Sequence, residues 1–217
     1  MEFDITATPM FVNLNRLHYP VSSLGFGQRV AVWFQGCSLQ CPGCVSRDTW
    51  EHGLGTMPLE RLMEQIARWS DAADGLTVSG GEPFEQPGAL RELLLWWRQQ
   101  QGGDVLVFSG LSWELLQRTY PDILQLIDVL ISDPFEAGAG QTLSLRGSDN
   151  QRLHCLSPLG QERYWQIPEE RVLDVCLDGD KVWLAGIPRP GDLAKLRSQL
   201  QGLGLEFSTS DQAGCMP

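Results

Sequence analysis

The chain has 217 residues, of which 42% are hydrophobic, and it carries a formal net charge of -11. This length supports one substantial core, which buries roughly 70% of the surface of the unfolded chain. No block of lysine and arginine rises above the acidic background, so the composition argues against nonspecific binding to nucleic acid or to an anionic membrane. Because residues 1–30 lack a signal-peptide pattern and no apolar run reaches membrane-spanning length, we expect a cytoplasmic protein.

The elements predicted up to residue 132 alternate between strand and helix. In chain order they are an edge strand at 10–18, a buried strand at 29–35, a helix capped by Thr56 with Leu59, Leu62, Met63 and Ile66 on one face, a strand at 75–79, a helix at about 88–101, a strand at 104–109, a helix capped by Ser112, and a strand at 128–132. This alternation indicates a parallel sheet with right-handed crossovers. It fits a partial TIM-like barrel and an open doubly wound sheet equally well.

The C-terminal part of the chain has a different pattern. Residues 143–152 are polar and unlike a core element. Beyond them we expect strands at 172–177 and at 181–186 around an Asp178-Gly179 turn, then a helix at about 190–201 and a strand at 203–208. This ββαβ pattern predicts a small module over residues 155–217, joined to a main domain over residues 1–154.

Three cysteines follow the first buried strand. Cys37, Cys41 and Cys44 are separated by three and by two residues, a spacing that suits either an iron-sulfur cluster or a zinc ion. Either metal centre would keep one open coordination position. Zinc would need a fourth protein ligand to close a structural site, and we expect no nearby histidine to supply one. The remaining cysteines, Cys155, Cys176 and Cys215, lie far away in the sequence.

Glycines and polar residues also follow the next three strands. Gly80, Gly81 and Glu82 end the second buried strand, Ser109 ends the third, and Asp133 ends the fourth. Parallel α/β sheets gather their functional residues at the carboxyl ends of the strands. We therefore expect these residues to lie at the same edge as the cysteines.

In this order, the motifs resemble those of radical S-adenosylmethionine (SAM) enzymes. Cys-x3-Cys-x2-Cys after one strand and Gly-Gly-Glu-Pro after the next carry the general resemblance. A closer similarity, to the activating proteins of anaerobic ribonucleotide reductase, covers roughly residues 8 to 154. It is carried by Phe34-x-x-Cys37, Cys41-Pro-Gly-Cys44, Thr49-Trp50, Ser79-Gly-Gly-Glu-Pro83, Asp128-Val-Leu-Ile131, Pro134-Phe135, Arg146-Gly-Ser and Asn150-Gln151.

The resemblance implies a fold, cofactors and a reaction. The fold is a partial (β/α) TIM-like barrel of the radical SAM type. One site-differentiated 4Fe-4S cluster would be held by Cys37, Cys41 and Cys44, and its fourth iron would chelate the amino and carboxylate groups of SAM. Reduction of the cluster would then cleave SAM to methionine and a 5′-deoxyadenosyl radical, so that the cofactor performs the difficult chemistry and the protein positions it.

The resemblance also implies residues that bind SAM. Gly80 and Gly81 would let the backbone approach SAM closely, and Glu82 with nearby carbonyls would accept from its ammonium group. The segment with Arg146 and Asn150 would bind the SAM carboxylate or the backbone of a partner, unless it is simply a solvated loop. The complete set of candidates is Gly80, Gly81, Glu82, Ser109, Asp133, Arg146 and Asn150.

The chain departs from the family pattern at three places. Relatives commonly have Asp-Gly before the Pro-Phe pair, where this chain has Ser132-Asp133, and an aromatic residue often stands where this chain has Val45. The largest departure is the extension from about residue 155, which the short reductase activators lack.

The remaining cysteines show no ferredoxin-type spacing, and we expect them to pack as small apolar residues; they are Cys155, Cys176 and Cys215. We likewise expect structural roles for His18 and His154.

Three functions are compatible with these observations. The first is a glycyl-radical-enzyme activase, which takes an α-hydrogen from a glycine of a partner such as anaerobic ribonucleotide reductase and draws electrons from a donor such as flavodoxin or ferredoxin. The second is a radical SAM maturase or accessory enzyme that acts on another protein or on a small molecule. The third is a catalytically silent module that binds zinc or an iron-sulfur cluster.

Overall fold

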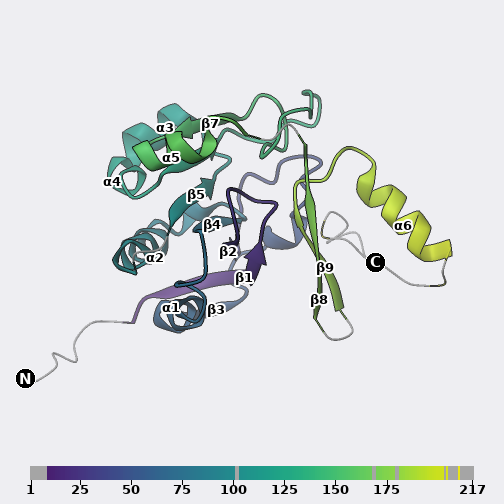
Figure 1. Cartoon of the computed structure of the whole chain (residues 1–217). Coiled ribbons are helices and arrows are strands. Elements are labelled where there is room, and N and C mark those ends of the chain that lie inside the picture. The colour runs from purple at the N-terminus through teal and green to yellow at the C-terminus, as the bar shows by residue number, and fades with distance from the viewer. Residues whose placement is uncertain are drawn as a thin grey trace, which may run out of the picture.

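A computed structural model of the chain describes residues 9–100, 103–167, 170–178, 181–202, 204 and 210. Within these residues, helices cover one face of an open sheet, and a C-terminal hairpin lies on the other side (Figure 1). None of the helices in the described part combines the length and the hydropathy that are needed to span a bilayer.

The sheet has seven strands in the order β3-β1-β2-β4-β5-β6-β7. Its central strands are parallel: β2 (Arg29–Phe34), β4 (Gly75–Gly80), β5 (Asp104–Phe108) and β6 (Val129–Ser132). The strands on either side are antiparallel: β1 (Phe11–Val21), β3 (Thr56–Pro58) and β7 (Arg152–Cys155). The predicted α/β class with a mostly parallel central sheet is confirmed. The TIM-like barrel is not, because β3 and β7 are open edges and the described sheet does not close.

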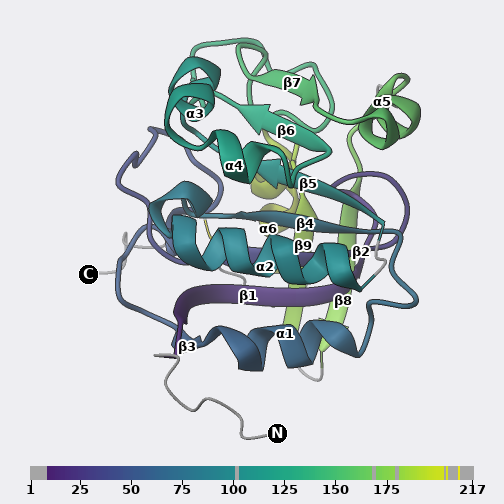
Figure 2. The ribbon, with the colours of Figure 1, turned by 90° about the vertical axis from the view of Figure 1, so that its left-hand side faces the viewer.

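Helices pack on one face of this sheet, where Figure 2 shows α1, α2 and α4 in front of the strands. They are α1 (Leu59–Ala67), α2 (Pro87–Gln99), α3 (Trp113–Thr119) and α4 (Pro121–Leu124), with 3-10 turns η1 (Arg47–Thr49) and η2 (Pro83–Glu85). The face of α2 predicted to be apolar is buried, as Leu90, Leu93, Leu94 and Trp97 are each 0% exposed. Ser112 caps α3 as predicted, because its side chain accepts from Leu115 N.

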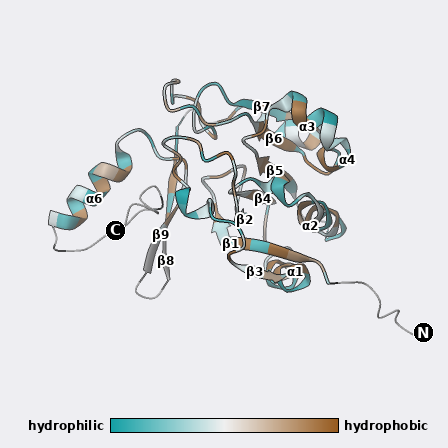
Figure 3. Ribbon diagram, turned by 180° about the vertical axis from the view of Figure 1, so that it is seen from behind, coloured by the Kyte–Doolittle hydropathy of each residue, from teal (hydrophilic) through white to brown (hydrophobic). Residues whose placement is uncertain are grey.

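Strand β2 is apolar on both faces because both of its faces are covered. Val30, Val32 and Phe34 point into the core beneath the helices, whereas Ala31 and Trp33 pack on the other side with Ala185 of the C-terminal hairpin. Buried parallel strands have this nearly continuous apolar pattern. Figure 3 shows the central strands in brown, the colour of hydrophobic residues.

Two local predictions near the N-terminus are wrong. β1 is not an edge strand, because β3 pairs with it on the side opposite β2. Thr56 does not cap a helix, since it belongs to β3 and its hydroxyl donates to Asn13 Oδ1 at 2.7 Å. Pro58 stands at the N-cap of α1 with no side-chain capping bond. Pairing with β1 therefore takes these residues away from the helix.

The C-terminal part contains two elements that the sequence pattern did not predict. β7 pairs with β6, so an edge strand begins at Arg152, the last residue of the polar 143–152 segment. Helix α5 (Pro158–Tyr164) follows, with Ser157 as its cap. The hairpin of β8 (Leu173–Asp178) and β9 (Lys181–Gly186) and the helix α6 (Asp192–Gly202) agree with the predicted pattern. The strand expected at 203–208 lies outside the described residues, apart from Gly204, as do the side chains of Cys176 and Cys215. The domain boundary at 154/155 stays a prediction.

Candidate functional site

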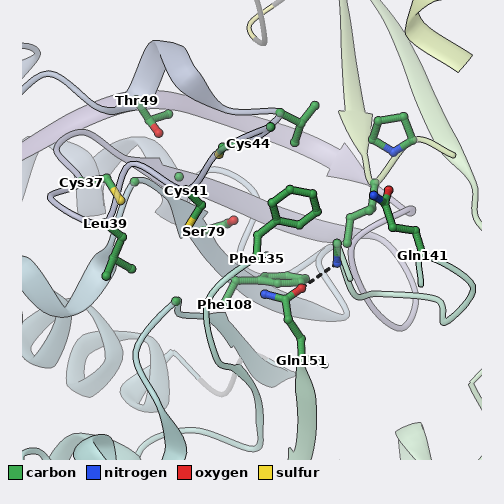
Figure 4. Close-up of a pocket in the computed structure, with 18 of the residues that line it drawn as sticks. Cys37, Leu39, Cys41, Cys44, Thr49, Ser79, Phe108, Phe135, Gln141 and Gln151 are labelled. Atoms are coloured by element: carbon green, nitrogen blue, oxygen red, sulfur yellow. Dashed lines mark hydrogen bonds between the residues drawn. The ribbon is translucent and has the colours of Figure 1, made fainter. Parts of the chain in front are cut away.

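A cavity of about 380 Å³ opens where β2, β4 and β5 end (Figure 4). This is the edge at which parallel sheets carry their functional residues, and the volume is typical of a small-molecule site. The predicted residues that line it are Cys37, Cys41, Cys44, Gly80, Gly81, Glu82 and Ser109. The prediction that these strand ends meet is therefore confirmed for this group.

The cysteine loop is fixed at both of its ends by backbone hydrogen bonds. Gly36 N donates to Thr49 O and Cys37 N donates to Trp50 O, so the loop folds back on the turn that follows it. Cys37 is buried and Cys44 is partly buried. Burial raises the pKa of the Cys37 thiol to about 11 and also raises that of Cys44. Since a metal binds the thiolate, loading this site must release protons.

The geometry of the loop fits a cluster better than a zinc ion. The three cysteines line one cavity, and in Figure 4 they lie along one loop, with Gln141 and Gln151 beyond Phe135. Among the described residues, no group of three histidine, cysteine or acidic side chains converges to hold a single ion. Zinc needs such convergence, whereas the cysteines around an iron-sulfur cube each bind a different iron. The described lining contains no histidine and no fourth cysteine, which suits a cluster with one open iron.

Gly80 and Gly81 are required by the protein backbone itself. Gly80 has φ +110°, and a Cβ there would lie 2.3 Å from Phe34 N and O. A Cβ on Gly81 would lie 2.1 Å from Gly36 O. Both distances are far below van der Waals contact, so only glycine lets the end of β4 pass this close to the end of β2. Contact of these glycines with SAM stays a prediction.

Glu82 joins the ends of β4 and β5. Its side chain is 0% exposed. The carboxylate accepts from Ser109 Oγ at 2.9 Å, Phe84 N at 3.0 Å and Gly110 N at 2.7 Å. Burial raises its pKa to about 7 despite these donors. Oε1 accepts two of the bonds and Oε2 one, so Oε2 keeps one lone pair for a donor in the cavity.

Asp133, Arg146 and Asn150 do not line the cavity. Asp133 has φ +83° and its carboxylate pairs with Arg152 at 2.7 Å, which lowers the pKa of Asp133. Asn150 Nδ2 donates to Pro134 O at 2.9 Å. These residues shape the loop that forms one side of the cavity, and their predicted direct contact with SAM stays untested.

Comparison with known proteins places the chain in a family. The family described as "4Fe-4S single cluster domain" matches residues 23–154. The anaerobic ribonucleoside-triphosphate reductase-activating protein of Salmonella typhimurium is 32% identical over 149 residues, which cover 64% of this chain and 96% of that protein. The chain belongs to the radical SAM activase-like family. The predictions of an enzyme with a 4Fe-4S cluster and SAM as cofactors are thereby confirmed.

One further relative and one solved structure differ in how much of the chain they match. The pyruvate formate-lyase-activating enzyme of Clostridium pasteurianum is 30% identical over 186 residues, which cover 82% of this chain and 70% of that enzyme. The crystal structure of QueE from Escherichia coli is 20% identical with a TM-score of 0.40, and the match covers 46% of this chain and 52% of that one. The Salmonella match leaves over a third of this activase-like chain unmatched.

The prediction from sequence missed several residues of the site. Phe108, Phe135 and Gln151 line the cavity, and Gln151 fixes two backbone positions: its Oε1 accepts from Gly147 N at 2.7 Å and its Nε2 donates to Asp133 O at 2.9 Å. Pro134-Phe135 and Asn150-Gln151 belong to motifs already noticed, so a signal for them existed. No sequence signal indicated the lining from the extension: Ile187, Pro188, Arg189, Pro190, Gly191, Leu193, Ala194 and Arg197.

One histidine lies near the cysteine loop, although it is not placed as a ligand. His52 lies beside the cysteine loop, where a Cβ on Gly36 would come within 2.9 Å of its ring. His52 Nε2 is 2.8 Å from Glu85 Oε2, and the same carboxylate accepts from Ser38 N. His52 thus braces the outside of the loop and is not part of the described cavity lining.

Proposed function

We propose that this chain activates a glycyl-radical enzyme by radical SAM chemistry. The observation that carries the proposal is the meeting of Cys37, Cys41, Cys44 and the Gly80-Gly81 turn around one cavity at the carboxyl edge of the sheet. The relatives named as activators of anaerobic ribonucleoside-triphosphate reductase and of pyruvate formate-lyase support it. The partner glycine would lose an α-hydrogen atom, so that a glycyl radical and 5′-deoxyadenosine form.

In this proposal Cys37, Cys41 and Cys44 would hold a 4Fe-4S cluster with one open position for SAM. When bound and reduced, the cluster would supply the electron for the cleavage of SAM to methionine and a 5′-deoxyadenosyl radical. The electron comes from a low-potential donor of the flavodoxin or ferredoxin class. Glu82 would accept a hydrogen bond from the SAM ammonium through the lone pair left on Oε2, and Phe108 and Phe135 would keep water from the apolar side of the cavity.

Anaerobic reconstitution with iron and sulfide tests this function. We expect dithionite-reduced protein to give a 4Fe-4S EPR signal that changes on SAM addition, and to form 5′-deoxyadenosine. A glycyl-radical enzyme expressed alongside should then acquire a glycyl EPR doublet. Cys41→Ala should abolish all three signals. Cys155→Ala should keep them, because Cys155 is a free cysteine on β7 outside the cavity lining.

A second candidate is a radical SAM maturase or accessory enzyme. Residues of the extension line the cavity, which favours a substrate different from that of relatives whose match covers only 64% of this chain. This second function is supported if the reconstituted protein forms 5′-deoxyadenosine from SAM and yet no glycyl-radical enzyme tested acquires a glycyl EPR doublet. A glycyl EPR doublet in a partner enzyme would instead support the activase function.

A further inference from the structure

The C-terminal extension forms a wall of the cavity. The loop after β9 contributes Ile187 and Pro188, and the start of α6 contributes Leu193 and Ala194. In Figure 1 this part of the chain runs beside the main sheet before α6 leads away from it. Some of the residues that face the cysteine loop across the cavity therefore come from a segment that begins more than 30 residues after the family match ends at residue 154.

The hairpin that leads to this wall is anchored to the main sheet. The Asp174 carboxylate accepts from Ser22 N and Ser23 N, each at 2.8 Å, and from Ser22 Oγ at 2.7 Å. Burial alone would raise the pKa of Asp174, but these donors outweigh it and lower the pKa. On the same hairpin, Trp183 packs edge-on against Trp33 of β2, with ring centroids 6.3 Å apart. The hairpin is thus held by polar and apolar contacts at separate points.

Arg171 ties the wall to the opposite loop of the cavity. Its guanidinium donates to Leu143 O at 3.1 Å and to Arg146 O at 2.8 Å, both in the loop that leads to Gly147 and Gln151. It also donates to Pro188 O at 3.0 Å, in the wall itself. One planar cation therefore holds three carbonyls from two parts of the chain. Arginine suits this role better than lysine, because its donors form a planar fork whereas lysine is a point charge.

The end of the chain adds a contact to the cysteine loop. Ser210 Oγ donates to Val45 O at 2.6 Å, next to Cys44. Ser210 of the extension therefore contacts the loop that carries the cysteines.

We propose that the extension completes the radical site, with Arg171 as a positioning residue and with Leu193 and Ala194 as residues that determine what the cavity accepts. The substrate role within this proposal rests on the radical SAM function proposed above. By forming one side of the cavity, the wall limits the molecule that loses hydrogen to a segment that fits between the wall and the cysteine loop and that has apolar groups facing Leu193 and Ala194. The wall itself exists whether or not the protein cleaves SAM.

A thiol-accessibility measurement tests the wall without any cofactor. In the reduced, cluster-free chain, Arg171→Ala should release the loop at Pro188 and make the alkylation of Cys41 and Cys44 by iodoacetamide about fivefold faster or more, as followed by mass spectrometry. Arg91→Ala is the matched control, because Arg91 pairs with Glu92 and Asp122 on the helix face of the protein. Equal rates in wild type and Arg171→Ala overturn the positioning role.

A pair of substitutions on α6 tests whether this helix contacts SAM or the substrate in the cavity. This test does not depend on the role of Arg171. Ala194 and its neighbour Lys195 are both exposed, but only Ala194 lines the cavity. We expect Ala194→Trp to lower either the affinity of the reconstituted protein for SAM or the amount of product formed per SAM cleaved, by about tenfold or more. Lys195→Trp should change neither quantity. Equal behaviour of both variants overturns the proposal. If wild-type protein cleaves no SAM, the proposed function fails, while the alkylation rates still decide whether the wall exists.

Discussion

The Ser109 hydroxyl donates to the Glu82 carboxylate at 2.9 Å, which links the ends of two neighbouring strands at the floor of the cavity. Both residues stand at the end of a predicted strand, and both are expected from the sequence to lie at one edge of the sheet. The structure shows how they meet: the carboxylate turns inward and is held by donors from the next strand's end. Glu82 is therefore first of all a residue that builds the site.

Removal of this hydroxyl should destabilise the protein. Ser109→Ala takes away one of three donors to a buried carboxylate, so the free energy of unfolding should fall by about 1 to 2 kcal/mol. Losing a donor should also raise the pKa of Glu82 further. Urea unfolding of the cluster-free protein measures the first effect. An unchanged unfolding midpoint would mean that the hydrogen bond contributes nothing in solution.

The glycine turn should be intolerant of a single methyl group. Gly81→Ala places a Cβ 2.1 Å from Gly36 O, so the backbone before Cys37 must move. We expect destabilisation of about 2 kcal/mol or more and less iron and sulfide bound per chain after reconstitution. Gly138→Ala is the control, because a Cβ at Gly138 would meet nothing within 4 Å. Equal iron content in the two variants would contradict this account of Gly81.

Much of the main domain could be predicted because its signals are local. The buried strands, the apolar face of α2 and the cap of α3 each depend on a few neighbouring residues, and the strand ends then follow from the parallel order. The prediction failed where tertiary pairing overrides local preference. Thr56 has the chemistry of a helix cap, but its segment pairs with β1, and the polar residues before Cys155 end in an edge strand because β6 has an unpaired side.

The site was predictable only where its residues follow strands of the sheet. Cys37, Gly81 and Glu82 were found in this way. Pro188 and Ala194 were not, because only the docking of the hairpin through Asp174 and Arg171 brings them to the cavity. Such docking depends on single polar contacts, which join residues 152 positions apart for Asp174 and Ser22 and 17 positions apart for Arg171 and Pro188. A single sequence carries no periodic signal for such contacts.

Acid should weaken the loop that carries Asp133. Arg152 lowers the pKa of this carboxyl below its ordinary value of 3.8, so its stabilising effect is fully present above pH 3.8 and is lost as the pH falls through the lower pKa of the folded state. Asp133→Asn keeps a side chain that tolerates the positive φ but loses the ion pair. We expect its free energy of unfolding to be about 1 kcal/mol lower than that of wild type at pH 6, with the difference shrinking below pH 3.8. Unfolding curves measured at each pH give this difference. If the difference between the two free energies of unfolding stays constant across this pH range, the ion pair of Asp133 is not the source of the pH dependence.

The stability of the sheet edge at which the parallel strands begin should depend strongly on one buried ion pair. Arg29 and Asp104 are each 0% exposed, and Arg29 also donates to Thr77 Oγ1 at 2.6 Å. Arg29→Met would leave the Asp104 carboxylate buried with only Arg163 and Tyr164 as side-chain partners, so we expect a loss of about 3 kcal/mol in the free energy of unfolding. Arg91→Met should change it by less than about 0.5 kcal/mol, since Arg91 is half exposed and its ion pairs lie at the surface. Because this edge is remote from the cavity, reconstituted Arg29→Met protein that is still folded should keep the EPR response to SAM. Loss of that response without loss of stability would show that the two edges of the sheet are coupled.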